Sequence, residues 1–455
     1  MKKSTVLLCS LLITGLVACV DHAPEPTPTG VAAWREGSFL NNFATSIATD
    51  KDGNVYLTGS YEDPVTFGST TLIHSGGDDM FVVKYNSSGV VQWAKRAGTP
   101  RGDAGTGIAV DAQGNVYVTG YFSGFIGFGT FTLSTGSSLV SDIFVVKYNS
   151  NGDVLWARKA GGNDVDAGQG IAVDGSGNVF ITGFFNDVAT FGSVTLTSTK
   201  ESDIFLAKYN TAGDLQWAQK AGGLFSDVGR SVAVDKNGFV LLTGTFHTLA
   251  TIGGQSLTSQ GGVDAFLAKF DQNGALQWLR QAGGAMNDAG NGVAVDEAGN
   301  VSFTGAFQGV ATIAGSTLTS KGVSDIFVAT FDAAGALKWA RGIGGVNYDD
   351  GMRIQFGNTG NVYMAGMFRE SVTIGSQTFT TNTASDILLV KFSPDGAVLW
   401  AKQDGGPNNE TVRGLALTTM GDVYVAGHFF VSTTLAGIPL VSAGNEDIFV
   451  VRYKE

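Results

Sequence analysis

The chain has 455 residues, of which 43% are hydrophobic, 11% aromatic and 15% charged. This aromatic content excludes a disordered chain, and 65 glycines without a three-residue period exclude a collagen-like one. The formal net charge of -12 argues against nucleic acid as a partner, because phosphate binding depends on clustered Lys and Arg.

The N-terminal segment has the features of an export signal. Lys2 and Lys3 precede an apolar run that ends at Ala18-Cys19, which predicts a signal peptide over residues 1–18. The placement of Cys19 resembles the lipobox of bacterial lipoproteins, which implies that Cys19 is lipidated and becomes the new N-terminus. The alternative is an ordinary signal peptide with an incidental cysteine.

Residues 19–29 alternate Pro with polar residues, which predicts an extended tether between the lipid and the folded part. No other segment has the roughly 18 to 20 uninterrupted apolar residues that a membrane helix needs. We therefore expect an exported lipoprotein that contacts the membrane only through its lipid. Val20 favours the outer membrane, with the protein facing the periplasm or the cell surface.

A repeat of about 61 residues accounts for residues 30–455. Its first marker is a tryptophan with a glycine four residues before it, found at Trp34, Trp93, Trp156, Trp217, Trp278, Trp339 and Trp400. Its second marker is an aspartate that opens an apolar run, found at Asp79, Asp142, Asp203, Asp264, Asp325, Asp386 and Asp447. Its third marker is the segment GNVYVTG at Gly114 to Gly120, which recurs in altered form at the same step.

Each repeat is predicted to form four β-strands separated by turns rich in Gly, Asn and Asp. In the second copy the predicted strands are residues 108–110, 116–121, 143–148 and 154–160. This pattern predicts an all-β fold, a seven-bladed β-propeller of four-stranded blades. The first unit matches a fourth strand and the chain stops just after a third, so we expect the N-terminal strand to complete the last blade. The tryptophans are predicted to be core residues between blades.

The segments IAVD, GNVYVTG, SDIFVVKYN and GDVLWARKAGG resemble the seven-bladed β-propeller (SBBP) repeat of bacterial exported proteins. The resemblance covers nearly all of residues 31–455. It implies the fold and no single activity, since that family is defined by its repeat.

An acidic residue or Asn stands five residues before each predicted first strand, at Asn42, Asp103, Asp166, Asp227, Asp288, Asp349 and Glu410. We expect this acidic ring at the mouth of the central channel. Its six carboxylates can hold a hard cation such as Ca²⁺, or attract a cationic ligand. The alternative, favoured by the seven-fold recurrence, is that each side chain caps its own turn by accepting hydrogen bonds from nearby amides.

Departures from the repeat are the stronger signal for a ligand. Three arginines interrupt it close to the first strands, namely Arg230, Arg353 and Arg413. Arg230 and Arg413 share a position that the other repeats fill with Thr45, Thr106, Gln169, Asn291 and Met352. We predict that the three arginines converge on an anion, since guanidinium groups match carboxylates. Ion pairs with the acidic ring are the alternative.

No catalytic residue is assigned, because the four histidines show no paired spacing and no P-loop or thiol nucleophile is present in the mature chain. The first hypothesis is a monomeric scaffold that binds a protein or glycan at the cell envelope without catalysis and without a required cofactor, Ca²⁺ being possible. The competing hypothesis is an exported carbohydrate-active or other hydrolytic enzyme with its site at the channel mouth. A third is a purely structural envelope protein.

Overall fold

The structure is a computed structural model that describes residues 29–137 and 139–455. The predicted signal peptide, Cys19 and the tether up to residue 28 lie outside the described residues. The described residues form strands and turns and no helix, so no helix among them is long and apolar enough to cross a membrane. Thr29, predicted as the end of the tether, is the first residue of a strand.

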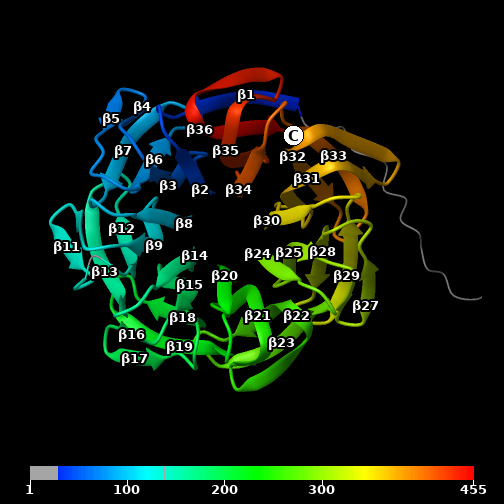
Figure 1. The fold of residues 1–455 in the computed structure, drawn as a ribbon, viewed down its shortest axis with the longest axis horizontal. Coiled ribbons are helices and arrows are strands. Elements are labelled where there is room, and N and C mark those ends of the chain that lie inside the picture. The colour runs from blue at the N-terminus through cyan, green and yellow to red at the C-terminus, as the bar shows by residue number, and fades with distance from the viewer. Residues whose placement is uncertain (1–28, 138) are drawn as a thin grey trace, which may run out of the picture.

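The strands form a ring of radial sheets around a central channel (Figure 1). Seven inner strands line the channel, namely β2 (Asn42–Thr49), β8 (Ala104–Val110), β14 (Ala167–Val173), β20 (Val228–Val234), β24 (Ala289–Val295), β30 (Asp350–Phe356) and β34 (Glu410–Leu417). They begin earlier than predicted, because the Ala-Gly segment before each apolar triplet pairs as well.

Each inner strand is followed outward by three antiparallel partners, and these four strands together form one repeat. The second strands are β3 (Val55–Tyr61), β9 (Val116–Phe122), β15 (Val179–Phe185), β21 (Val240–Ile252), β25 (Val301–Phe307), β31 (Val362–Ile374) and β35 (Val423–Leu435). The third strands are β6 (Asp79–Tyr85), β12 (Asp142–Tyr148), β18 (Asp203–Tyr209), β22 (Gln255–Phe270), β28 (Asp325–Phe331), β32 (Gln377–Phe392) and β36 (Ile438–Lys454). The outer strands are β7 (Val91–Ala97), β13 (Val154–Gly162), β19 (Leu215–Gly223), β23 (Leu276–Gly284), β29 (Leu337–Ile343), β33 (Val398–Asp404) and β1 (Thr29–Glu36).

The connection from the second to the third strand contains a hairpin that the sequence analysis missed. In three repeats it is the continuous extension of the two long strands, as in β21 and β22. In the other four it is built of separate short strands, which are β4 (Val65–Phe67), β5 (Thr70–Leu72), β10 (Phe125–Phe128), β11 (Phe131–Ser134), β16 (Val188–Phe191), β17 (Val194–Thr197), β26 (Val310–Ile313) and β27 (Ser316–Thr319).

The prediction of seven separate four-stranded blades is wrong, because strands of neighbouring repeats are joined into larger sheets. The described residues form four four-stranded sheets, one six-stranded sheet, one ten-stranded sheet and two two-stranded hairpins, so fewer than seven large sheets. The sheets merge because outer strands β13, β19 and β23 end in Gly-Gly and pair there with the hairpin of the next repeat. A Cβ at Gly284 would overlap the carbonyl oxygen of Val310, so glycine permits this approach. The fold is an all-β propeller with some of its sheets joined at the outer edge.

The N-terminal strand closes the ring, as predicted. Strand β1 pairs antiparallel with β36, with Trp34 opposite Val450 and Glu36 opposite Ile448. The two ends of the chain therefore share one sheet, so the ring is closed by backbone hydrogen bonds between strands far apart in the sequence.

The tryptophans lie between adjacent repeats, which confirms their predicted role. In five of the seven, the indole Nε1 donates to a turn carbonyl of the next repeat at 3.1 to 3.3 Å, from Trp93 to Ser150, Trp156 to Thr211, Trp217 to Gln272, Trp278 to Ala333 and Trp339 to Pro394. The Nε1 of Trp34 has no such partner. The turn glycine stacks on the ring: Gly335 has φ 82°, and a Cβ there would lie 2.8 Å from Cδ2 of Trp278. Seven apolar clusters fill the spaces between repeats in the same way.

We predict that Gly284→Ala lowers the free energy of unfolding by about 1–3 kcal/mol, because its methyl group separates β23 from β26. The matched control is Gly127→Ala in β10, where a Cβ meets nothing within 4 Å, with an expected change within about 0.5 kcal/mol. Chemical denaturation followed by tryptophan fluorescence measures both. Equal effects of the two substitutions would contradict this role of the Gly-Gly segment.

Candidate functional site

Each inner strand contains a β-bulge that aims one side chain out of the regular alternation. The ladder between the first two strands skips one residue in every repeat, namely Thr45, Thr106, Gln169, Arg230, Asn291, Met352 and Arg413. This is the position that the sequence analysis singled out for its arginines and placed before the first strand. The structure places it inside the inner strand.

Short side chains at the bulge tie one repeat to the next. Thr106 Oγ1 donates to the carbonyl of Gly168 at 2.7 Å, and Asn291 Nδ2 donates to the carbonyl of Gly351 at 3.0 Å. Arg230 instead donates from Nη1 to Oδ1 of Asn291 at 2.8 Å. Arg230 at the bulge thus lacks the hydrogen bond to the backbone of the next repeat and instead places a guanidinium group beside that repeat.

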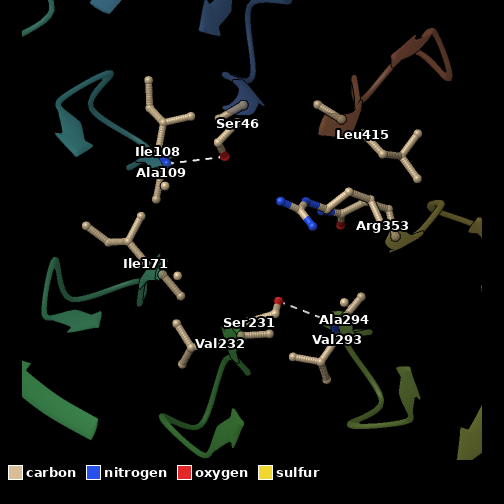
Figure 2. A pocket seen from close by; sticks show the side chains of 18 of the residues that line it. Ser46, Ile108, Ala109, Ile171, Ser231, Val232, Val293, Ala294, Arg353 and Leu415 are labelled. Carbon is tan, nitrogen blue, oxygen red and sulfur yellow. Dashed lines mark hydrogen bonds between the residues drawn. The ribbon is translucent and has the colours of Figure 1, made fainter. Parts of the chain in front are cut away.

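The channel contains a cavity of about 450 Å³ lined by the inner strands. Most of the side chains labelled in Figure 2 are aliphatic, and Ile108, Ile171 and Val232 are among them. The guanidinium group of Arg353 points into the cavity from β30. Arg353 Nη1 donates to the carbonyl of Met352 at 2.9 Å. The cationic side chain that enters this cavity is the strongest feature of the candidate site.

The three predicted arginines form one electrostatic group. Burial, together with the positive charges of Arg413 and Arg230, lowers the pKa of Arg353 to about 10. Burial also lowers the pKa of Arg230, with Asp350 opposing this effect and Arg413 adding to it. Within residues 29–137 and 139–455, none of the three forms an ion pair with a carboxylate. Their binding of an anion stays a prediction.

Two neighbours of the arginines were missed by the sequence analysis. Asp350 is an acidic neighbour of the arginines: burial raises its pKa, and Arg230, Arg369 and Arg413 oppose that rise. A signal for it was present, because the equivalent positions of the following and preceding repeats are uncharged. His428 is buried in β35 with no partner for Nδ1, and burial together with Arg413 lowers its pKa to about 3. The histidine is therefore neutral at physiological pH.

The acidic ring is buried, and its side chains bind backbone amides. Asp288 shows the pattern: Oδ2 accepts from the amide of Gly284 at 2.7 Å, and Oδ1 accepts from the amide of Gln308 at 3.0 Å. The same two contacts recur at Asp103, Asp166, Asp227 and Asp349, whereas Glu410 keeps only the first. This geometry matches the capping alternative.

The structure does not gather the acidic ring into one cluster. In the described part of the chain, no group of three or more His, Cys, Asp or Glu side chains is arranged to hold a metal ion. Each ring carboxyl group lies at its own junction between repeats, and both oxygens of the five aspartates accept from backbone amides, whereas only Oε2 of Glu410 does so. Calcium binding by these residues stays a prediction.

The loops that lead into the inner strands expose apolar side chains on one face of the ring. We call this set the apolar loop rim, and it comprises Phe39, Leu40, Val165, Leu224, Phe225, Met286, Val346 and Tyr348. Because every inner strand begins on this face, the rim lies on the same side of the ring as the bulges and the arginines. The candidate site therefore combines an apolar surface with a cationic channel.

The comparisons with known proteins agree with the repeat and the fold. A family model described as Beta-propeller repeat matches residues 92–121 and 155–183. An uncharacterised WD repeat-containing protein of Acanthamoeba polyphaga mimivirus is 25% identical over 418 residues, which is 73% of this chain and 30% of that protein. Regulatory protein FlaEY of Caulobacter vibrioides is 31% identical over 164 residues, which is 34% of this chain and 17% of that protein. The chain thus spans less than a third of the length of either relative.

Among solved structures, the Pan2 WD40 domain of Neurospora crassa has a TM-score of 0.46 at 10% identity, covering 90% of this chain and 89% of that one. Sqt1 of Chaetomium thermophilum has a TM-score of 0.41 at 10% identity, covering 95% and 100%. The pairing of the strands and the repeat match make this chain a β-propeller repeat protein.

We predict that Asp288→Ala lowers the free energy of unfolding by about 2–4 kcal/mol, because the amides of Gly284 and Gln308 lose their acceptor. The control is Glu297→Ala in an exposed turn, with an expected change within about 0.5 kcal/mol. Urea unfolding at constant pH measures both. If Asp288→Ala left the free energy of unfolding unchanged, that result would contradict the bridging role of the acidic ring.

Proposed function

We propose that this protein is an exported, lipid-anchored scaffold that binds a protein partner on the face where the inner strands begin, as a monomer and without catalysis or a required cofactor. A β-propeller is at the coarse level an interaction scaffold, and binding residues are disproportionately carried by loops such as those on this face. The observation that carries the proposal is the guanidinium group of Arg353, which points into the channel with no carboxylate in contact.

The charge of the channel defines the group that the partner supplies. A guanidinium group withdrawn from water without an anion is costly, and Arg353 faces only further positive charge from Arg413 and Arg230. Among the described residues, Asp350 opposes the charges of Arg230 and Arg413 and Glu446 opposes that of Arg413, whereas the charges that act on Arg353 are both positive. A carboxylate entering the channel would meet a fork of N–H donors and relieve this repulsion.

The apolar loop rim favours protein as the source of that carboxylate. Aliphatic and thioether side chains such as Leu224, Met286 and Val346 are exposed on this face. Protein interfaces commonly place apolar anchors around a few polar contacts, whereas a polar glycan gains little from aliphatic surface. The expected partner is a segment with an acidic side chain or a C-terminal carboxylate flanked by apolar residues.

Selection of displayed random peptides on the intact protein should enrich peptides with Asp, Glu or a free C-terminus beside apolar residues. We predict that Arg353→Met weakens the enriched peptides about tenfold or more, since a charge-assisted hydrogen bond is lost. The control Arg101→Met removes the same charge from an exposed loop on the same face and should change the affinity less than about twofold.

Enriched peptides that lack carboxylates, or equal binding by the Arg353→Met protein, would contradict the proposed site. Binding confined to acidic glycans in a parallel array would contradict a protein partner. Turnover of any glycan in that array would favour the competing enzymatic function.

The lipid anchor has its own test, because Cys19 lies outside the described residues. We predict that the full-length precursor expressed in a Gram-negative host incorporates labelled fatty acid and fractionates with the membrane. Cys19→Ala should abolish the label and release the protein, whereas Cys9→Ala within the predicted signal peptide should leave both unchanged. Continued membrane association of unlabelled Cys19→Ala protein would contradict anchoring by lipid.

A further inference from the structure

Two buried carboxyl groups meet at six of the junctions between repeats. One belongs to the aspartate that opens a third strand, and the other to the acidic-ring residue 24 positions later. We call these the carboxyl pairs, and they are Asp79/Asp103, Asp142/Asp166, Asp203/Asp227, Asp264/Asp288, Asp325/Asp349 and Asp386/Glu410, all at most 4% exposed. The two groups of a pair share one small space, since a Cβ at Gly405 would lie 2.7 Å from Oδ1 of Asp386 and 2.9 Å from Oε2 of Glu410.

At least one oxygen of every pair has no hydrogen-bond partner, and the Asp386/Glu410 pair has two, since Oε1 of Glu410 is also unpartnered. The oxygen unpartnered at all six junctions is Oδ1 of the strand aspartate, namely Asp79, Asp142, Asp203, Asp264, Asp325 and Asp386. The other oxygen is satisfied, as Asp264 Oδ2 accepts from the amide of Gln260 at 3.1 Å and from Nε2 of Gln281 at 2.5 Å. A buried oxygen left without a donor is rare and costly, and here it recurs six times.

The seventh junction contains the missing donor. There the acidic-ring position is Asn42, and its Nδ2 donates to Oδ1 of Asp447 at 3.4 Å. Asp447 Oδ1 is accordingly satisfied, unlike its six equivalents. An amide differs from a carboxylate in having a donor, and a protonated carboxyl group provides the same donor. This comparison within one chain favours a proton over a metal cation at the other six junctions.

The six pairs differ in the residue that the outer strand places beside them. Asp79, Asp142 and Asp203 contact Arg96, Lys159 and Lys220 at 3.2, 2.5 and 3.2 Å respectively. The equivalent outer-strand residue is uncharged at the next three junctions, where it is Gln281, Gly342 or Gln403. We call Asp264/Asp288, Asp325/Asp349 and Asp386/Glu410 the neutral pairs. Two adjacent carboxylates without a contacting cation are strongly unfavourable in a buried place.

We propose that each neutral pair binds one proton as a carboxyl–carboxylate hydrogen bond, so that these junctions weaken as the pH rises. The O–H of one group donates to an oxygen of the other, and the proton is exchanged with solvent. All three neutral pairs lie at the start of a channel-lining strand, and Asp349 immediately precedes β30, the strand that carries Arg353.

The direction of the pH dependence follows from the environment of the pairs. Burial is the main cause that raises the pKa of Asp288 to about 7, of Asp349 to about 7 and of Glu410 to about 8, and the partner aspartate raises each further. Because the folded-state pKa lies above the unfolded one, the stabilisation is complete at acidic pH. It is lost as the pH rises through about 7 to 8.

Three further charged groups face the neutral pairs. Asp350 raises the pKa of Asp349, and Asp404 raises that of both Asp386 and Glu410. Lys321 is the one cation, and it lowers the pKa of Asp325 against the larger effect of burial. Apart from Lys321, these neighbours strengthen the retention of a proton.

The test replaces the strand aspartates of the neutral pairs together, as Asp264→Asn, Asp325→Asn and Asp386→Asn in the full chain. Asparagine keeps an acceptor for the existing donors and places an NH₂ group at the unpaired oxygen, as Asn42 does. The wild-type melting temperature should fall between about pH 4 and about pH 8, and the triple variant should lose less than about half as much. The control Asp142→Asn should melt below the wild type throughout this range, because Lys159 loses its partner.

A direct readout is the infrared absorption of protonated carboxyl groups at about pH 7. It should be present in the wild-type protein, weaker in the triple variant and lost at alkaline pH. Absence of this absorption in the wild-type protein would overturn the proposal even if the triple variant fails to fold. The proposal would also be overturned if the melting temperature of the triple variant fell with pH as much as that of the wild type. A melting temperature that depends on added Ca²⁺ and on chelator would overturn it as well.

Discussion

A buried acidic side chain at the start of six of the seven inner strands provides the contact on which the rest of this propeller depends. Asp288 accepts one hydrogen bond from the end of the preceding outer strand and one from the residue after the second strand of its own repeat. One side chain thereby connects two adjacent repeats and positions the inner strand between them. The bulge, the channel-lining residues and the arginines come directly after this side chain in the sequence, so its position fixes where they lie.

The repeats contain structurally equivalent positions, and a binding site requires that some of these positions carry different residues. At the bulge, Thr106 and Asn291 bond the next repeat, so these positions are satisfied within the ring. Arg230 and Arg413 occupy the same position with longer, charged side chains, and Arg353 lies one residue beyond it in β30. Because equivalent positions of a closed ring face one axis, these departures bring positive charge together in the channel.

The acidic junctions and the channel meet at β30. Asp349 belongs to a neutral pair, Asp350 faces the arginines, and Arg353 points into the cavity, all within five consecutive residues. The same loop exposes Val346 and Tyr348 in the apolar loop rim. Protonation, anion binding and partner contact are therefore all proposed for one short segment.

The sequence by itself determined the repeat, the order of its strands, the closing role of the N-terminal strand and the grouping of three arginines, because each follows from spacing along one chain. Only the tertiary structure decided which repeat each marker contacts: Gly335 packs on Trp278 of the preceding repeat, and Asp264 faces Asp288 across a junction. The Gly-Gly segments, read as connections, join sheets through backbone hydrogen bonds that carry no side-chain pattern. Residues that contact the next repeat recur with the same sequence spacing as residues that contact their own repeat. Only the closed ring therefore shows which of the two kinds of contact a residue makes.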